Sequence, residues 1–155
     1  MRIFLDCEFT ELSAAAKLMS LALVAENGRE FYVELLDAWR EEDCSEFVKE
    51  IVLPQLWGGS YALPIIEARI SLLAFLASFD NEIEIVTDAP GYDWELFCDL
   101  VYEGGRWPRI VRNFPTDATK LSPVNEGTEL PHHALMDARI IANMFVPGIS
   151  KTALP

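Results

Sequence analysis

The first apolar run of the chain ends in two acidic residues on alternate positions. Residues 2–10 read RIFLDCEFT, which is typical of a β-strand that places Asp6 and Glu8 near its end. Side chains of a strand alternate between its faces, so both carboxylates project from the same face. Two carboxylates so close on one face repel each other unless a cation lies between them, and a divalent ion with oxygen ligands fits that position. The alternative is an ordinary strand that runs into a polar loop.

Two later segments supply further chemistry. Residues 131–140, PHHALMDARI, begin an expected helix whose early turns carry Asp137, with His132 in the loop or first turn before it. Residues 82–94, EIEIVTDAPGYDW, alternate in a strand from 82 to 87. A turn then delivers Asp93 to the start of a second helix. These positions predict a cluster of carboxylates beside a histidine.

Together, the three segments resemble a known family. Asp-x-Glu on a first strand, Tyr-Asp opening a helix and His-x4-Asp at a late helix resemble the motifs of the DEDDh 3′–5′ exonucleases. These enzymes belong to the ribonuclease H-like superfamily. The stretch from Asp6 to Tyr32 is similar to the adenosine-preferring exoribonucleases called RNase AS, and the resemblance extends from Met1 to Phe145. It implies metal ligands at Asp6, Glu8, Asp93 and Asp137, and a general base at His132.

Two neighbouring residues compete for these roles. Asp88 is a second candidate for the middle carboxylate, although the aromatic-Asp pair and the helix that follows favour Asp93. His133 competes with His132, but the spacing to Asp137 favours His132. His133 is then expected to face solvent or a neighbouring loop.

The resemblance implies hydrolysis of the phosphodiester bond at the 3′ end of single-stranded RNA by a two-metal-ion mechanism. Carboxylate oxygens suit Mg²⁺ or Mn²⁺, and two ions about 4 Å apart can activate water and stabilise the leaving oxygen. We expect Asp6 to bridge the ions and Glu8 and Asp137 to serve one of them. Asp93 is expected to support the site through the other ion or its waters. His132 would accept the proton of the attacking water.

Four residues are candidates for substrate contact. Phe9 and Thr10 follow Glu8 directly and are expected to touch the terminal nucleotide, although Phe9 also suits a core. Arg106 and Trp107 lie in a basic segment, residues 104–112, whose mixture of arginine and tryptophan suits phosphate contact and base stacking. For Trp107 the alternative is a core anchor.

Length and charge narrow the remaining possibilities. The 155 residues predict a single domain, 1–155, with a tail or interface segment at 146–155. A net charge of −13 argues against tracking along duplexes, but less against an enzyme that holds a 3′ terminus. The longest apolar stretch, 71–79, is too short to cross a membrane, and no signal peptide is visible. We expect a cytoplasmic protein with reduced cysteines and a possible homodimer.

The order of expected elements predicts an α/β fold with a ribonuclease H-like, mixed five-stranded sheet flanked by helices. Strands at 2–5, 17–25 and 30–35 form an antiparallel meander, with Asn-Gly as a hairpin turn. Helices follow at 45–51 and 64–79, the latter with apolar residues on overlapping faces: Ile66, Ile70, Leu73 and Leu76. Parallel strands at 82–87 and near Ile110, and helices after each, complete the sheet.

Two other functions share these features. A DNA exonuclease or an enzyme that trims short oligonucleotides uses the same chemistry, so the site residues cannot separate them from an exoribonuclease. A non-catalytic nucleic-acid-binding protein could keep the fold, but it has little need for the whole ligand set.

Overall fold

A mixed sheet forms the centre of the protein. The computed structural model describes residues 1–102, 104–121 and 131–148, and within them six strands pair in the order β4-β3-β2-β1-β5-β6. Their bounds are β1 Arg2–Phe9, β2 Leu18–Ala25, β3 Glu30–Leu35, β4 Ala62–Leu63, β5 Glu84–Thr87 and β6 Thr116–Asp117. β2 pairs antiparallel with both β1 and β3. The other pairs are parallel: β5 with β1, β4 with β3 and β6 with β5. This arrangement is compatible with a ribonuclease H-like fold.

The expected meander is confirmed, but the expected number of strands is wrong. β4 and β6 are two residues long each, which is too short to show any hydrophobic periodicity in the sequence. The strand expected near Ile110 is reduced to an isolated bridge between Ile83 and Val111. The chain pairs with β5 again only at β6.

The hairpin between β2 and β3 follows from its turn residues. Gly28 has a φ of 84°, in the left-handed region that residues with a side chain rarely adopt. The Asn27 side chain accepts a hydrogen bond from the Arg29 amide at 3.1 Å, and the Ala25 amide donates to the Arg29 carbonyl at 2.8 Å. The turn therefore fixes the register of the meander.

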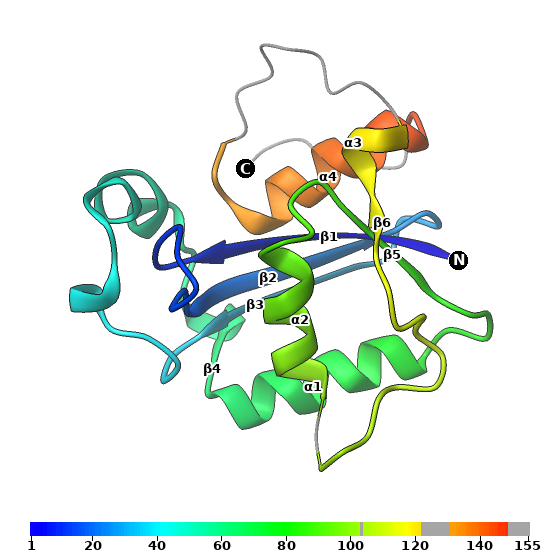
Figure 1. Cartoon of the computed structure of the whole chain (residues 1–155), viewed down its shortest axis with the longest axis horizontal. Helices are drawn as coiled ribbons and strands as arrows, with labels where there is room; N and C mark the ends of the chain where they lie inside the picture. Colours follow the sequence, from blue (N-terminus) through cyan, green and yellow to red (C-terminus); the bar gives the residue numbers. More distant parts are fainter. Residues whose placement is uncertain (103, 122–130, 149–155) are drawn as a thin grey trace.

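Helices cover both faces of the sheet. Figure 1 shows α4 (Ala134–Phe145) on one face and α1 (Ile65–Ala77) and α2 (Asp93–Val101) on the other. The helix expected at 45–51 is instead a helical stretch containing the π-helix η2 (Val48–Val52), continued by the 3₁₀ turn η3 (Leu53–Gln55). The remaining short elements are η1 (Glu41–Asp43), η4 (Gly59–Tyr61) and α3 (Ala118–Leu121). Of the expected tail, 149–155 lies outside the described residues.

Only part of the apolar surface of α1 is buried. Ala68, Leu72 and Leu76 are buried, whereas Ile66 and Ile70 are 65% and 63% exposed. Apolar residues surround most of this helix, so their spacing could not select the face that packs on the sheet. Of the four residues expected on overlapping faces, Leu76 is buried and Leu73 is partly buried, whereas Ile66 and Ile70 are exposed.

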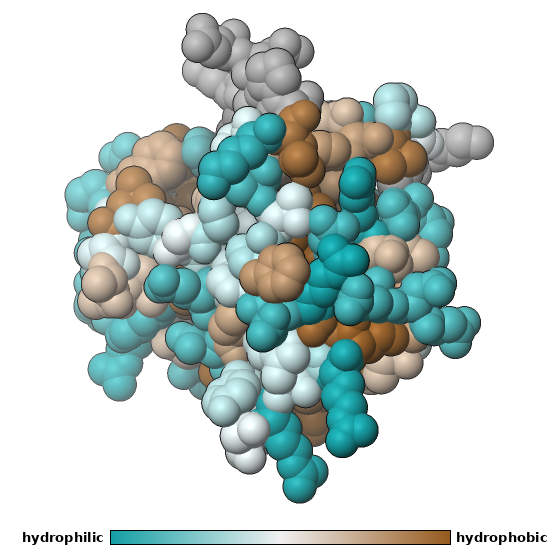
Figure 2. Space-filling model, turned by 45° about the vertical axis from the view of Figure 1, so that its right-hand side comes forward, coloured by the Kyte–Doolittle hydropathy of each residue, from teal (hydrophilic) through white to brown (hydrophobic). Residues whose placement is uncertain are grey.

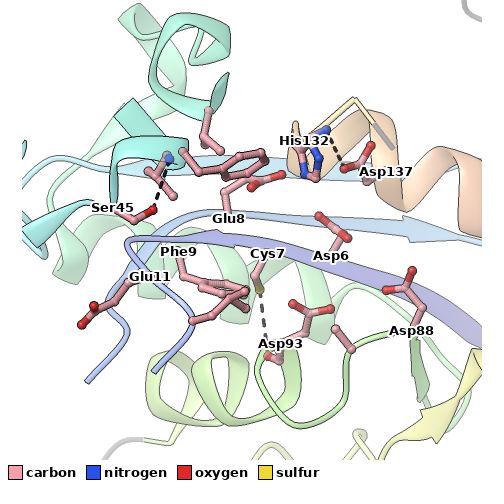
Figure 3. A pocket seen from close by; sticks show the side chains of 15 residues that line it. Asp6, Cys7, Glu8, Phe9, Glu11, Ser45, Asp88, Asp93, His132 and Asp137 are labelled. Atoms are coloured by element: carbon pink, nitrogen blue, oxygen red, sulfur yellow. Dashed lines mark hydrogen bonds between the residues drawn. The ribbon is translucent and has the colours of Figure 1, made fainter. Parts of the chain in front are cut away.

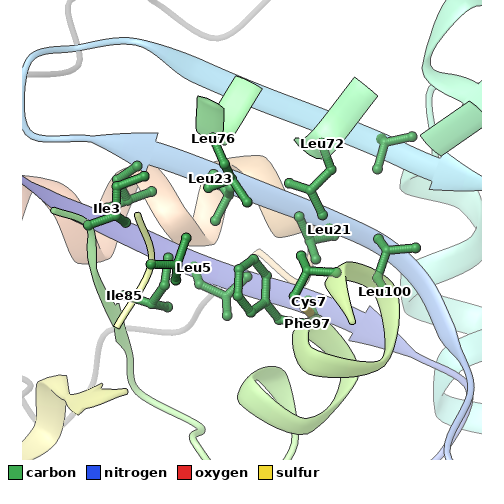
Figure 4. Close-up of a cluster of buried hydrophobic side chains, with 14 of the residues drawn as sticks. Ile3, Leu5, Cys7, Leu21, Leu23, Leu72, Leu76, Ile85, Phe97 and Leu100 are labelled. Atoms are coloured by element: carbon green, nitrogen blue, oxygen red, sulfur yellow. The ribbon is translucent and has the colours of Figure 1, made fainter. Parts of the chain in front are cut away.

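The alternation of β1 divides the core in two. On one face, β1 and β2 pack against α1 and α2 through the cluster in Figure 4, which includes Ile3, Leu5, Cys7, Leu72, Leu76 and Phe97. On the other face, Phe4 packs with Ala138 and Ile141 of α4. Cys7 therefore faces the core on the opposite side of the strand from Asp6 and Glu8, because side chains of a strand alternate between its faces.

The surface of the protein is largely hydrophilic on the face that Figure 2 shows. The face shown in Figure 2 carries many hydrophilic side chains, with apolar groups scattered among them. In the described part of the chain, no helix is both long and apolar enough to pass through a membrane.

Candidate active site

Asp6 and Glu8 lie on the face of the sheet that α4 covers. In β1 they stand opposite Ala22 and Ser20 of β2, and both carboxyls are nearly buried, at 7% and 9% exposure. Phe4, one step earlier on the same face, belongs to the core under α4. The strand thus changes from apolar to acidic on one face where the core ends.

Asp137 reaches the same place from the first turn of α4. Its amide donates to the His133 carbonyl at 3.0 Å, and its Oδ2 accepts from the His132 amide at 3.0 Å. Ala134 and Ala138 are fully buried beside it. Because these side chains are small, the helix can approach the sheet closely and bring Asp137 toward β1.

Asp88 and Asp93 come from the end of β5 and the start of α2. Asp88 follows the last residue of β5, and Asp93 is the first residue of α2, where a negative charge is favourable. Asp93 is 1% exposed, and its Oδ2 accepts a hydrogen bond from the Thr87 hydroxyl. The turn between them brings both aspartates to the cluster, whereas only one of the two was expected there.

The five carboxylates form two groups that share Asp6. Ligand atoms of Asp6, Glu8 and Asp137 lie within 4.8 Å of one another, and so do those of Asp6, Asp88 and Asp93. Figure 3 shows Asp6 between the two sets. Both groups offer only carboxylate oxygens, which suits Mg²⁺, Mn²⁺ or Ca²⁺ rather than zinc.

Burial raises the pKa of the clustered carboxyls, and neighbouring carboxylates raise it further. The pKa of Glu8 rises to about 8 through burial, then through Asp137 and Asp93. Burial likewise raises the pKa of Asp137 to about 7 and that of Asp93 to about 7. The pKa of Asp6 lies well above its usual range, from burial first and then from Asp93 and Glu8. A divalent cation would displace the protons that these groups retain near neutral pH.

An unpaired oxygen agrees with cation binding. Among the described residues, Asp137 Oδ1 is buried without a hydrogen-bond partner, which ordinarily costs free energy. It belongs to the group formed with Asp6 and Glu8. The residues present therefore fit a pair of divalent ions that share Asp6.

His132 stands at the edge of the cluster in an uncommon backbone conformation. Its φ is 60°, in the left-handed region, and its ring makes an edge contact with Phe47 at 5.0 Å between centroids. Together with the acidic residues it lines a cavity of about 470 Å³. The structure thus brings together His132 and all four expected ligands.

His133 is buried rather than facing solvent, and its contact with Trp57 in the segment 56–58 agrees with the other expectation, that it faces a neighbouring loop. It is 4% exposed, stacks on Tyr32 at a centroid distance of 4.9 Å and packs at a tilt against Trp57 at 4.5 Å. As the residue before α4 it turns away from the cavity, because the left-handed turn at His132 sends consecutive side chains in different directions.

The apolar wall of the cavity was not anticipated from the sequence. Phe47, Val48 and Val52 line it from the segment that contains η2, and Leu12 lines it from the loop after β1. Their helical stretch includes a π-helix, an arrangement that standard helical spacing does not reveal. Phe9 also lines the cavity and stacks on Tyr92 at 5.0 Å.

Three other predicted contacts lie elsewhere. The Thr10 hydroxyl accepts from the Lys17 amide at 3.0 Å, and its residue is 1% exposed. Trp107 packs against Trp94 and Phe97 and donates to the Val111 carbonyl at 2.7 Å, which agrees with the core-anchor alternative. Arg106 is exposed. Thr10, Arg106 and Trp107 are not among the described residues that line the cavity.

Comparison with known proteins adds one independent finding. No model of a known protein family matches the chain. Two proteins from two strains of Mycobacterium tuberculosis, each named a 3′–5′ exoribonuclease, are 29% identical to it over 153 residues. The alignment covers 90% of this chain and 88% of each relative. This similarity supports an exonuclease family.

Ion binding should change the thermal stability in a pH-dependent way. The raised pKa values mean that the folded, ion-free protein retains protons that the unfolded chain releases above about pH 4. Its stability should therefore fall as pH rises toward about 8, the pKa of Glu8. Mn²⁺ should raise the melting temperature by roughly 5–10 °C at pH 8 when present at 100 times its dissociation constant, and by less at pH 5.

Differential scanning fluorimetry with EDTA or Mn²⁺ measures this response. Asp6→Asn should lose it because Asp6 belongs to both groups, whereas Asp80→Asn, an exposed control, should keep it. An equal Mn²⁺ response in Asp6→Asn would contradict a shared site.

Proposed function

We propose that the protein is a metal-dependent 3′–5′ exoribonuclease that hydrolyses the terminal phosphodiester bond of single-stranded RNA. The observation that carries the proposal is the pair of carboxylate groups sharing Asp6 in a cavity that His132 also lines. The relatives named 3′–5′ exoribonuclease support the activity and the substrate. The motifs shared with the DEDDh enzymes and RNase AS support the finer assignment to that family.

Asp6, Glu8 and Asp137 would hold one ion, and Asp6 with Asp93 the other, with Asp88 in reach of the second group. Two bound Mg²⁺ or Mn²⁺ ions would supply charge stabilisation and an activated water. The buried carboxylates would fix the positions of the two ions, because four of them lie on a strand or a helix whose place is set by the core.

His132 is proposed to take the proton of the attacking water. His132 lines the cavity, and its backbone amide donates a hydrogen bond to Asp137. One hydrogen bond therefore joins the proposed base to a proposed metal ligand. An imidazole exchanges protons near neutral pH, which suits a general base.

The cavity wall suits a single terminal nucleotide. Phe9, supported from behind by Tyr92, offers an aromatic surface beside Glu8, and Phe47 offers another beside His132. The described lining residues include no lysine or arginine. Phosphate attraction would therefore come from the bound ions, which agrees with an enzyme that grips an end rather than a duplex.

A digestion panel tests the proposed function. End-labelled RNA and DNA oligomers, single- and double-stranded and including poly-A, are incubated with Mg²⁺, Mn²⁺, Zn²⁺ or EDTA. We expect RNA to shorten from its 3′ end with Mg²⁺ or Mn²⁺ and to remain intact in EDTA. Preferred digestion of DNA or of very short oligomers would replace the substrate assignment, and full activity in EDTA would exclude the two-ion mechanism.

The two middle aspartates should differ in their importance. Asp93→Asn should abolish RNA turnover, because Asp93 is buried and oriented by Thr87. Asp88→Asn should retain most of it, because Asp88 is only partly buried. Initial rates at saturating Mn²⁺ measure both. The reverse order of effects would transfer the ligand role to Asp88.

The neighbouring histidines provide a matched pair. His132→Ala should lower turnover by about 10²- to 10⁴-fold through loss of proton transfer, while the Mn²⁺ response of the melting temperature survives. His133→Phe should retain turnover, because both ring nitrogens of His133 are buried without a partner among the described residues. Similar losses in the two variants would show that His132 is not the base.

A further inference from the structure

A single glutamine connects the loop that carries His132 to the wall of the cavity. Gln55, the last residue of η3, donates through Nε2 to the Ile51 carbonyl at 2.8 Å and to the Pro131 carbonyl at 2.6 Å. The His132 carbonyl lies 3.4 Å from the same nitrogen. The glutamine thus joins segments 76 residues apart in the sequence.

The chemistry of the amide accounts for these contacts. A side-chain amide nitrogen has two N–H donors, which match the two short contacts to Ile51 and Pro131, while the third acceptor is longer. A carboxylate of the same shape has no donor when ionised. In its place it would set negative charge against carbonyl oxygens.

The hydrogen bonds of Gln55, called the tether below, restrain a backbone segment in an unfavourable conformation. His132 has a φ of 60°, a conformation that costs free energy for a residue with a side chain and persists only where its surroundings enforce it. From one side its amide bonds to Asp137, and after it His133 is packed against Tyr32 and Trp57. Gln55 supplies the restraint from the side of the preceding residue, Pro131.

The segment that holds Gln55 is itself part of the cavity. Phe47, Val48 and Val52 line the cavity, and the Phe47 ring contacts the His132 ring. The start of this segment is fixed to β1's end, because the Ser45 amide donates to the Thr10 carbonyl at 2.9 Å. A shift of this segment would therefore be transmitted by Gln55 to the loop that carries His132.

We propose that Gln55 is a positioning residue: it holds the His132 backbone against the cavity wall so that the imidazole meets the attacking water. The inference rests on the proposed function, since His132 must act as the base. Gln55 is not among the described residues that line the cavity, so it is proposed to act only through the loop. A displacement of about 1 Å at a reacting group can lower turnover by about 10²-fold.

The kinetic test uses Gln55→Glu, which keeps the shape, Gln55→Leu, which removes all polarity, and Glu50→Gln as an exposed control on the same segment. Both Gln55 variants should lower kcat by about 10- to 10²-fold with little change in KM, and the control should behave as the wild type. In a His132→Ala background, Gln55→Leu should cause no further loss, because two residues that act as a unit are not additive. The same fold-loss in both backgrounds would overturn the proposal.

A second measurement does not depend on activity. The chain has two histidines, so side-chain NMR gives separate imidazole signals for His132 and His133. Gln55→Glu should shift or broaden the His132 signals and leave those of His133, which lies in its aromatic packing, unchanged. Unchanged His132 signals in a folded variant would overturn the proposal. A wild type that hydrolyses no nucleic acid would instead overturn the proposed function, while this comparison still reports on the tether.

Discussion

Repulsion among buried carboxylates is the constraint around which this protein is built. Asp6 belongs to two groups of carboxylates at once, and burial together with the neighbouring carboxylates raises its pKa. An arrangement of this kind opposes folding, so the rest of the structure must hold it in place. The antiparallel meander and the helix α4 do so by means of a core that ends just before the acidic residues.

The positions of the site residues could be predicted where they follow from local rules. Strand alternation placed Asp6 and Glu8 on one face and Cys7 on the other, and turn chemistry placed Asp93 at a helix start. The Asn-Gly hairpin signal was sufficient for the meander. Each of these features depends on a few neighbouring residues, so a single sequence is sufficient to predict it.

Features that depend on distant partners could not be predicted in the same way. The buried face of α1 could not be identified from the sequence, because Ile66 and Ile70 are as apolar as the residues that pack on the sheet. The burial of His133 depends on Tyr32 and Trp57, which lie far away in the sequence. The apolar wall, the tether at Gln55 and the two short edge strands likewise arise from tertiary packing.

The hydrogen bond between the His132 amide and Asp137 has a consequence for how far such a sequence can diverge. It spans five residues, so the separation between the proposed metal ligand Asp137 and the proposed base His132 is set within one short stretch. Substitutions in the sheet, or on the exposed side of α1, can accumulate without altering that separation. Retention of this one short segment would therefore preserve the separation even in chains that are only 29% identical overall.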